Sequence, residues 1–402
     1  MKRFLPVMLL ATLALAGCHS YKKENIHPPT PLAKDFKASV QVKQVWDARI
    51  GKGAGLTGVR LRPAYADGRL YVASTDGHIA ALDAVSGKTL WERSTRMRSR
   101  LLWLGRKATR WPDAYYSGGP VVSGDLLVVG TLDGHVYGLD AKTGDERWHA
   151  ELAAEVLSPP AIVGDQVVVR TEDGRVYSLN RETGARQWAN DGGNVPVLSL
   201  RGNGALLAVN GVVFMGTDDG KLISLRLDNG EKLWEQLLAS GEGRTDIDRL
   251  DDADGDVVLD GTTLYASAYH GNLSAVDGPS GRPLWSRAFS SATTPVVSNN
   301  MLYAVNDDSE VWAFDKAGGT DMWRSNALKY RWLSAPAVQG DYTVVGDFQG
   351  YVHWLKTSDG SLAARERLSK KAIRSQPLVV GDMVYVEDIA GHIAAYRLPK
   401  TP

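Results

Sequence analysis

Cysteine is almost absent from this chain, because its 402 residues include a single one, Cys18. One cysteine cannot close a disulfide within the chain, so no covalent cross-link stabilises the fold. An excess of charge of either sign is also missing, since 46 Lys and Arg balance 46 Asp and Glu. This balance argues against nucleic acid as a partner and against a long-range membrane-binding patch.

Signatures of catalysis are missing as well. The sequence contains no H-E-x-x-H zinc motif, no G-x-S-x-G nucleophile turn and no phosphate-binding glycine loop. His78, His135 and His392 follow a repeat glycine and His270 precedes one, which is typical of hairpin turns rather than metal ligands. We therefore expect no enzymatic activity, no cofactor and no metal site.

A hydrophobic run long enough to span a bilayer comfortably is also lacking. The apolar stretch at residues 4–16 is short and follows the basic residues Lys2 and Arg3, which is typical of a cleaved signal. It leads into Leu15-Ala-Gly-Cys18, a pattern that resembles a bacterial lipoprotein signal. An ordinary secretory signal with a chance cysteine is the alternative.

Cleavage before Cys18 would expose its sulfur and its amine for acylation, and more than one acyl chain gives a stable membrane anchor. His19, rather than the Asp that retains such lipoproteins at the inner membrane, follows the cysteine. We therefore predict a signal peptide at 1–17, a lipidated flexible tether at 18–41 and a folded domain at 42–402, anchored in the outer membrane and facing the periplasm.

A repeat fills the folded domain. Gly-x-x-x-Trp occurs six times, and in the first five copies another Gly stands ten residues earlier. A seventh copy at Gly350 and Gly360 has Ala364 in place of Trp. A period near 40 residues indicates stacked units, each too small to bury its own apolar face. The six pairs are Gly87/Trp91, Gly144/Trp148, Gly184/Trp188, Gly230/Trp234, Gly281/Trp285 and Gly319/Trp323.

One repeat predicts four short strands joined by turns. In the second copy these are residues 120–122, 126–131, 135–140 and the strand around Trp148, with glycines at the turns. Four antiparallel strands make one blade of a β-propeller. Tryptophan supplies the large apolar area that joins one blade to the next.

Eight Trp-type strands predict an all-β, eight-bladed propeller of four-stranded antiparallel blades. The last copy begins at Gly391 and ends at Pro402 before its fourth strand, whereas Trp46 has no repeat in front of it. We therefore expect the N-terminal strand to close the ring, because an open solenoid would leave its ends exposed. Ala364 predicts one weaker contact between blades, unless a neighbour such as Trp354 fills the space.

Unequal intervals between successive tryptophans indicate that some connecting loops are longer than others. The interval between tryptophans is 40 residues from Trp148 to Trp188 but 46 and 51 in the next two intervals. The extra residues follow Trp strands, so the loops at 190–205 and 240–257 should lie side by side on one face, where binding concentrates. A third insertion, Arg96 to Arg110, is rich in arginine and suggests no role.

The two neighbouring loops carry the candidate site residues. The first places Leu198, Leu200 and Arg201 where polar residues are the default, which indicates either a docking surface or a small core beneath the loop. The second includes the acidic residues Asp252 and Asp254. It predicts a solvated acidic loop or a site for a basic partner.

Calcium is a further alternative for the second loop. Relative to Gly255, an EF-hand would need acidic residues at the positions of Leu250 and Gly261. The sequence therefore favours the other two interpretations.

Taken together, the Cys18 motif, the eight repeats and both loops resemble the BamB family, lipoprotein subunits of the machine that assembles β-barrels in the outer membrane. The resemblance implies that Leu198, Leu200 and Arg201, with Asp252 and Asp254, dock on the periplasmic POTRA domains of the barrel subunit BamA. It also implies the other lipoproteins of that complex as partners. Unfolded outer-membrane proteins are further candidates, because outer blade edges can accept an added strand.

The repeats alone also resemble the blades of pyrroloquinoline-quinone-dependent dehydrogenases. That resemblance implies calcium, a catalytic carboxylate and often a vicinal disulfide, which the lone Cys18 cannot form. A lipoprotein sensor that binds a ligand in the central funnel is the third possibility, since one fold hosts many functions. The sequence favours a non-catalytic scaffold that assists folding and insertion of β-barrel proteins.

Overall fold

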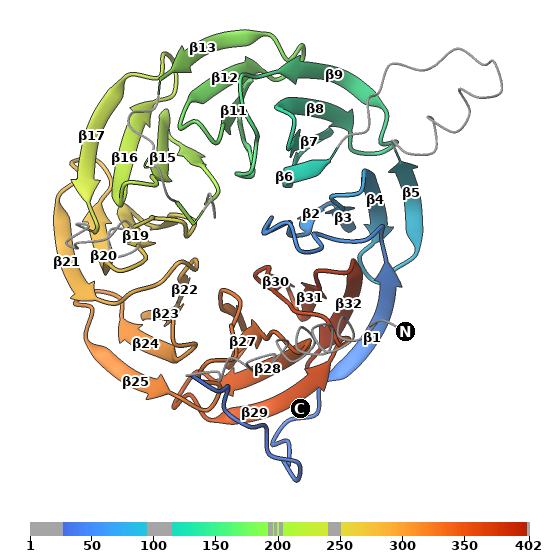
Figure 1. Cartoon of the computed structure of the whole chain (residues 1–402), viewed down its shortest axis with the longest axis vertical. Coiled ribbons are helices and arrows are strands. Elements are labelled where there is room, and N and C mark those ends of the chain that lie inside the picture. Colours follow the sequence, from blue (N-terminus) through green and yellow to red (C-terminus); the bar gives the residue numbers. More distant parts are fainter. Residues whose placement is uncertain are drawn as a thin grey trace, which may run out of the picture.

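The computed structural model describes residues 27–94, 115–191, 196, 199–200, 204–239 and 251–399. These residues form thirty-two strands and no helix, grouped into eight four-stranded antiparallel sheets. The sheets stand around a central axis as the blades of a propeller (Figure 1). The predicted all-β, eight-bladed fold is confirmed. No helix in this described part of the chain is long and apolar enough to cross a membrane.

Blades I to IV follow one another in the chain, each running from its inner strand to its outer strand (Figure 1). Blade I is β2 (Ala64–Ala66), β3 (Arg69–Ala73), β4 (His78–Asp83) and β5 (Thr89–Ser94). Blade II is β6 (Tyr116–Ser123), β7 (Leu126–Thr131), β8 (His135–Asp140) and β9 (Glu146–Glu151). Blade III is β10 (Ala161–Val163), β11 (Gln166–Arg170), β12 (Val176–Asn180) and β13 (Arg186–Asn190). Blade IV is β14 (Leu207–Val209), β15 (Val212–Gly216), β16 (Lys221–Arg226) and β17 (Lys232–Leu237).

Blades V to VII repeat this order, and blade VIII combines both ends of the chain. Blade V is β18 (Val258–Asp260), β19 (Thr263–Ser267), β20 (Asn272–Asp277) and β21 (Pro283–Ala288). Blade VI is β22 (Val296–Ser298), β23 (Met301–Val305), β24 (Val311–Asp315) and β25 (Asp321–Ser325). Blade VII is β26 (Ala337–Gln339), β27 (Tyr342–Gly346), β28 (Tyr351–Lys356) and β29 (Leu362–Arg367). Blade VIII is β30 (Leu378–Val380), β31 (Met383–Glu387), β32 (His392–Arg397) and β1 (Lys43–Arg49).

The ring is closed without a covalent bond. Strand β1 pairs antiparallel with β32, and Trp46 lies opposite Ala395. The indole nitrogen of Trp46 then donates a hydrogen bond to the carbonyl of Ala84 in blade I, at 3.0 Å. The predicted closure by the N-terminal strand is confirmed, because β1 completes blade VIII and also contacts blade I.

Each outer-strand tryptophan packs against the last turn of the following blade. The indole nitrogen of Trp91 in blade I donates to the carbonyl of Ala141 in blade II, at 3.1 Å. The indole ring lies so close to Gly144 that a Cβ there would come within 2.6 Å of it. Each glycine of Gly-x-x-x-Trp thus receives the tryptophan of the preceding blade. The same hydrogen bond joins Trp46 to Ala84, Trp148 to Arg181, Trp188 to Leu227, Trp234 to Gly278, Trp285 to Lys316 and Trp323 to Thr357.

The missing tryptophan at Ala364 has a structural reason. Blade VIII takes β32 and β1 from opposite ends of the chain, so no turn joins them and no turn glycine is present to receive an indole. Trp354 in β28 lies opposite Ala364 and is fully buried instead. Its indole nitrogen donates to Gln339 at 2.9 Å, and its ring lies 5.7 Å from that of Tyr396. Trp354 therefore fills the space in which a weaker contact was predicted.

The segment before β1 differs from the flexible tether predicted for 18–41. The N–H of Thr30 donates to the carbonyl of Lys329 at 2.9 Å, and Arg331 donates to the carbonyl of Thr30 at 3.0 Å. Leu32 packs against a hydrophobic cluster of blades VI and VII. Residues 27–41 are therefore attached to the propeller at several points, while the chain between these points loops outward beyond the rim of the ring (Figure 1).

Replacing Gly144 with Ala should destabilise the protein more than replacing Gly164 with Ala. Both glycines have positive φ, 71° and 56°, but only Gly144 touches an indole ring, whereas nothing lies within 4 Å of a Cβ at Gly164. Each substitution should lower the free energy of unfolding by about 1 kcal/mol through backbone strain. In Gly144→Ala, overpacking against Trp91 should lower the free energy of unfolding by about 1–3 kcal/mol more. Equal urea midpoints for the two variants would contradict this role of the turn glycines.

Candidate functional site

Two long loops enter consecutive blades from the same face of the ring. Loop L1 (residues 191–206) joins β13 to β14, and loop L2 (residues 238–257) joins β17 to β18. The two backbones touch, since a Cβ at Gly204 would come within 2.6 Å of the carbonyl oxygen of Gly255. The prediction that these loops lie side by side is confirmed.

Asp252 of loop L2 holds loop L1 in place. Its side chain is buried, and its carboxylate accepts a hydrogen bond from the N–H of Leu200. Its own backbone carbonyl accepts from the N–H of Tyr269 in blade V at 2.8 Å. The next residue, Ala253, donates to the carbonyl of Thr217 in blade IV at 3.1 Å. Asp252 and Ala253 together therefore connect Leu200 to blades IV and V.

The charge of Asp252 is poorly compensated. Burial raises the pKa of this carboxyl to about 7, the N–H of Leu200 acts in the opposite direction, and the carboxylates of Asp254 and Asp218 raise the pKa further. The buried cation nearby, Arg170, forms its ion pair with Asp218 at 2.7 Å. Asp252 therefore titrates near neutral pH, unlike an exposed carboxylate.

Asp256, which sequence reasoning did not select, supports the base of loop L1. Its carboxylate accepts a hydrogen bond from the N–H of Ala205 at 2.7 Å, and its own N–H donates to the hydroxyl of Thr294 at 2.9 Å. The other carboxylate oxygen forms an ion pair with Arg62. Asp256 stands in the acidic stretch of the sequence, but Arg62 precedes blade I, so no sequence pattern connects the two.

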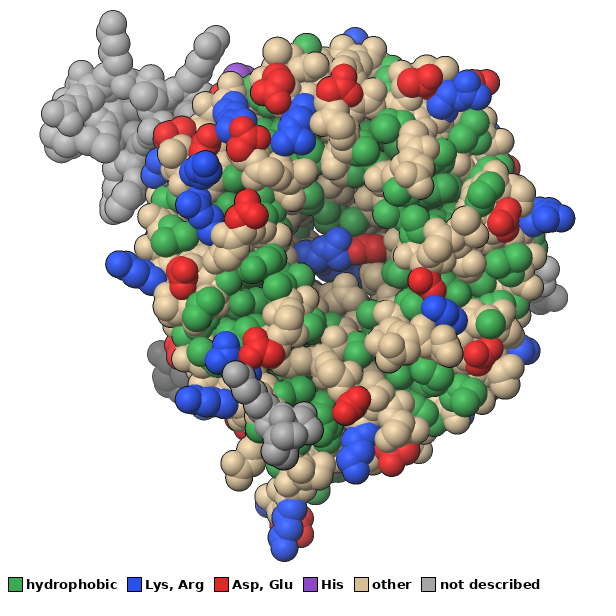
Figure 2. Space-filling view, turned by 180° about the vertical axis from the view of Figure 1, so that it is seen from behind, with side chains coloured by type: hydrophobic (Ala, Val, Ile, Leu, Met, Phe, Trp, Pro, Cys, Tyr) green, Lys and Arg blue, Asp and Glu red, His purple; other side chains and the backbone are tan. Residues whose placement is uncertain are grey.

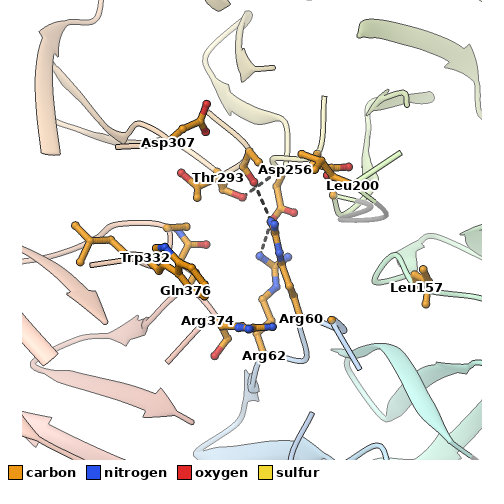
Figure 3. A pocket seen from close by; sticks show the side chains of 18 of the residues that line it. Arg60, Arg62, Leu157, Leu200, Asp256, Thr293, Asp307, Trp332, Arg374 and Gln376 are labelled. Carbon is orange, nitrogen blue, oxygen red and sulfur yellow. Dashed lines mark hydrogen bonds and ion pairs between the residues drawn. The ribbon is translucent and has the colours of Figure 1, made fainter. Parts of the chain in front are cut away.

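The loops at this face surround an axial cavity of ≈ 430 Å³. Arg60 and Arg62 enter it from blade I and reach the opposite wall, at blades V and VI (Figure 3). Arg60 donates to the carbonyl of Ala292 at 2.8 Å, while Arg62 pairs with Asp256. Seen from behind, basic and acidic side chains lie in the central opening (Figure 2). The axis of the propeller is therefore bridged by polar contacts.

The predicted partner-binding residues differ in exposure. Leu200 is 38% exposed and lies at the rim of the axial cavity. Asp252 and Asp254 are 0% and 3% exposed, so neither carboxylate offers a surface to a partner in the free protein. Leu198 and Arg201 lie outside the described residues, as do the predicted lipid site Cys18 and the insertion from Arg96 to Arg110. Of the predicted set, the structure brings Leu200 and Asp252 together directly.

The chain is similar over nearly its whole length to proteins of one family. A family model described as outer membrane protein assembly factor BamB matches residues 41–102, 100–325 and 307–398. An outer membrane protein assembly factor BamB from Xanthomonas campestris is 46% identical over 405 residues, 98% of this chain and 97% of the relative. The chain belongs to the BamB family. It is thus a member of a family of outer membrane protein assembly factors, as its sequence features predicted.

Among solved structures, a BamB protein matches this chain with a higher TM-score and a higher sequence identity than a propeller enzyme does. BamB of Moraxella catarrhalis superimposes with a TM-score of 0.77 at 28% identity, covering 89% of this chain and 100% of that one. A quinohemoprotein alcohol dehydrogenase of Pseudomonas putida reaches a TM-score of 0.67 over 92% of this chain and 78% of the enzyme, but at 14% identity. The likeness to the dehydrogenase shows the fold alone.

The stability contributed by Asp252 should depend on pH. Because its pKa is raised to about 7, the folded state binds more protons than the unfolded state between about pH 4 and pH 7. Its contribution to the free energy of unfolding therefore falls as pH rises through this window. Asp252→Asn keeps an oxygen that accepts from the Leu200 N–H but carries no charge, so its stability does not fall in this window. The free energy of unfolding of Asp252→Asn, relative to that of wild type, should therefore rise by on the order of 2 kcal/mol from pH 5 to pH 7.5.

Urea unfolding at these two pH values measures the effect. Asp228→Asn, which removes an exposed carboxylate from an outer turn of blade IV, is the matched control. If the stability difference between Asp252→Asn and wild type is the same at both pH values, the raised pKa of Asp252 is wrong.

Proposed function

We propose that this chain is a non-catalytic scaffold that docks loops L1 and L2 onto the periplasmic POTRA domains of the barrel subunit BamA. The observation that carries the proposal is Leu200, a half-exposed apolar side chain whose backbone N–H is held by the buried carboxylate of Asp252. A fixed backbone lowers the entropy lost when an apolar side chain is buried in an interface. Docking would in turn support the folding and insertion of outer-membrane β-barrel proteins.

We assign different roles to the two groups of predicted site residues. Leu198, Leu200 and Arg201 contact the partner, since arginine and buried apolar anchors dominate interface energies. Asp252 and Asp254 act through position, because their carboxylates are buried in the free protein. The acidic loop thus presents loop L1 rather than forming a basic-partner site of its own.

Membrane attachment belongs to the same proposal. Cys18, exposed by removal of residues 1–17, would carry the lipid on the periplasmic face of the outer membrane. Because residues 27–41 are attached to blades VI and VII, the chain from Cys18 to His27 sets the reach, about 30 Å when extended. This short reach keeps the propeller close to the membrane, where the other lipoproteins of the complex and unfolded barrel proteins are further partners.

Recovery of BamA from detergent-solubilised outer membranes tests the docking site. Leu200→Ala/Arg201→Ala should lower recovery at least tenfold, since two interface anchors are lost together. Leu284→Ala removes a 55% exposed leucine from the outer strand of blade V and should recover BamA as wild type does. Undiminished recovery by the double variant would overturn the site, and no recovery by wild type would overturn the scaffold.

Substitutions of Asp252 separate positioning from contact. Asp252→Ala removes the acceptor of the Leu200 N–H and should lower recovery, whereas Asp252→Asn retains an acceptor oxygen and should preserve most of it. Equal loss in both variants would instead assign the negative charge itself to the interface.

The dehydrogenase alternative predicts a different measurement. A scaffold should show no saturable binding of pyrroloquinoline quinone in an absorbance titration with calcium. The physical reason is that its single cysteine cannot form the vicinal disulfide that such enzymes often stack on the quinone. Saturable binding at micromolar quinone would contradict the non-catalytic assignment.

A further inference from the structure

The axial cavity combines three arginines from two blades. Arg60 and Arg62 precede β2 of blade I, and Arg374 precedes β30 of blade VIII. Their side chains converge near the axis (Figure 3). Like charges in a shared cavity repel one another, so this cluster is favourable only where anionic groups compensate it.

The cavity supplies fewer acceptors than these arginines require. Arg62 pairs with Asp256, and Arg60 donates to the carbonyl of Ala292. Arg374 is exposed and forms no ion pair or side-chain hydrogen bond with any described residue. Its guanidinium therefore retains a full set of donors directed at the cavity, in a geometry suited to a carboxylate.

The three acidic side chains that line the cavity form no ion pair with Arg374. Asp256 is shared between Arg62 and the N–H of Ala205. Asp307 is exposed on the wall opposite Arg374 (Figure 3), where its carboxylate accepts a hydrogen bond from the hydroxyl of Ser290. Asp254 is 3% exposed. The side chain next to Arg374 is therefore another cation, Arg60, and the exposed carboxylate of the cavity, Asp307, lies on the far wall.

An apolar anchor stands next to these arginines. Trp332 lines the cavity, is 70% exposed and has a φ of 50°, a conformation rare for a bulky side chain. The preceding residue, Arg331, fixes this turn, because it is buried, donates to Asp347 at 2.8 Å and binds the carbonyl of Thr30 at 3.0 Å. Exposed tryptophan held in a strained turn is a feature of binding sites. Leu157 and Leu200 line the opposite wall.

We propose that the axial cavity is a binding site for an acidic peptide segment. A carboxylate of the peptide pairs with Arg374 beside Arg60, and an adjacent apolar side chain packs on Trp332. The cavity of ≈ 430 Å³ and its mixed polar and apolar lining match a side-chain pair on a peptide rather than a free inorganic anion, which would leave Trp332 and Leu157 unused. This site goes beyond the docking of loops L1 and L2, because Arg374 and Trp332 lie on blades VII and VIII.

A labelled peptide tests the proposal on the folded chain. The probe is fluorescein-labelled, C-terminally amidated Gly-Ser-Phe-Glu-Phe-Ser-Gly, followed by fluorescence anisotropy, with Lys in place of Glu as the matched peptide. The Glu peptide should bind saturably and the Lys peptide at least tenfold more weakly. Arg374→Ala should weaken binding of the Glu peptide about tenfold, as expected for loss of a charge-assisted hydrogen bond. Trp332→Ala should weaken it severalfold.

Lys371→Ala provides the matched control, because it removes an exposed positive charge from the same connecting loop without lining the cavity. It should change peptide affinity less than twofold. Equal binding of the Glu and Lys peptides, equal loss in Lys371→Ala and Arg374→Ala, or displacement by inorganic phosphate with no effect of Trp332→Ala would each overturn the proposal.

Recovery of BamA separates this site from the docking loops. Arg374→Ala should lose the peptide and still recover BamA, whereas Leu200→Ala/Arg201→Ala should lose BamA. If Arg374→Ala also loses BamA at an unchanged urea midpoint, the cavity belongs to the docking interface and is not a separate site.

Discussion

The contact between each outer-strand tryptophan and the next blade's last turn is the interaction on which the rest of the structure depends. The turn must carry glycine, because a Cβ would enter the indole ring, and its carbonyl must be placed to accept the indole N–H. Repetition of this contact joins seven of the eight blade pairs and includes Trp46 at the closure. At the remaining junction the chain ends remove the turn, and Trp354 packs there instead. A ring built in this way needs no disulfide.

Loops L1 and L2 lie outside the tryptophan contacts that join the blades. Both connect an outer strand to the next inner strand, so both emerge on one face and their backbones meet at Gly204 and Gly255. Carboxylates of loop L2 then hold the backbone of loop L1, the buried Asp252 at Leu200 and the partly buried Asp256 at Ala205. Such acids are expensive to bury, which is why Asp252 titrates near neutral pH.

Asp256 also connects this surface to the axis. Through Arg62 it links the base of loop L1 with the loop that precedes blade I, across the opening of the ring. At the axis, side chains from blades far apart in the chain therefore meet. The dehydrogenase, at 14% identity, shares the fold alone, and the family relationship rests on the whole-length match to BamB proteins.

The sequence by itself determined the fold and the place of the loops, because glycine and tryptophan recur with the period of a blade and their spacing widens where loops grow. The closure by Trp46 was also predictable, since the last repeat lacks one strand. Only the tertiary structure decided that Asp252 and Asp254 are buried, that residues 27–41 are attached to blades VI and VII, and that Arg60, Arg62 and Arg374 share a cavity. Each of these features depends on contacts between residues far apart in the chain. A local sequence pattern does not indicate which distant side chain will cover a residue or pair with its charge.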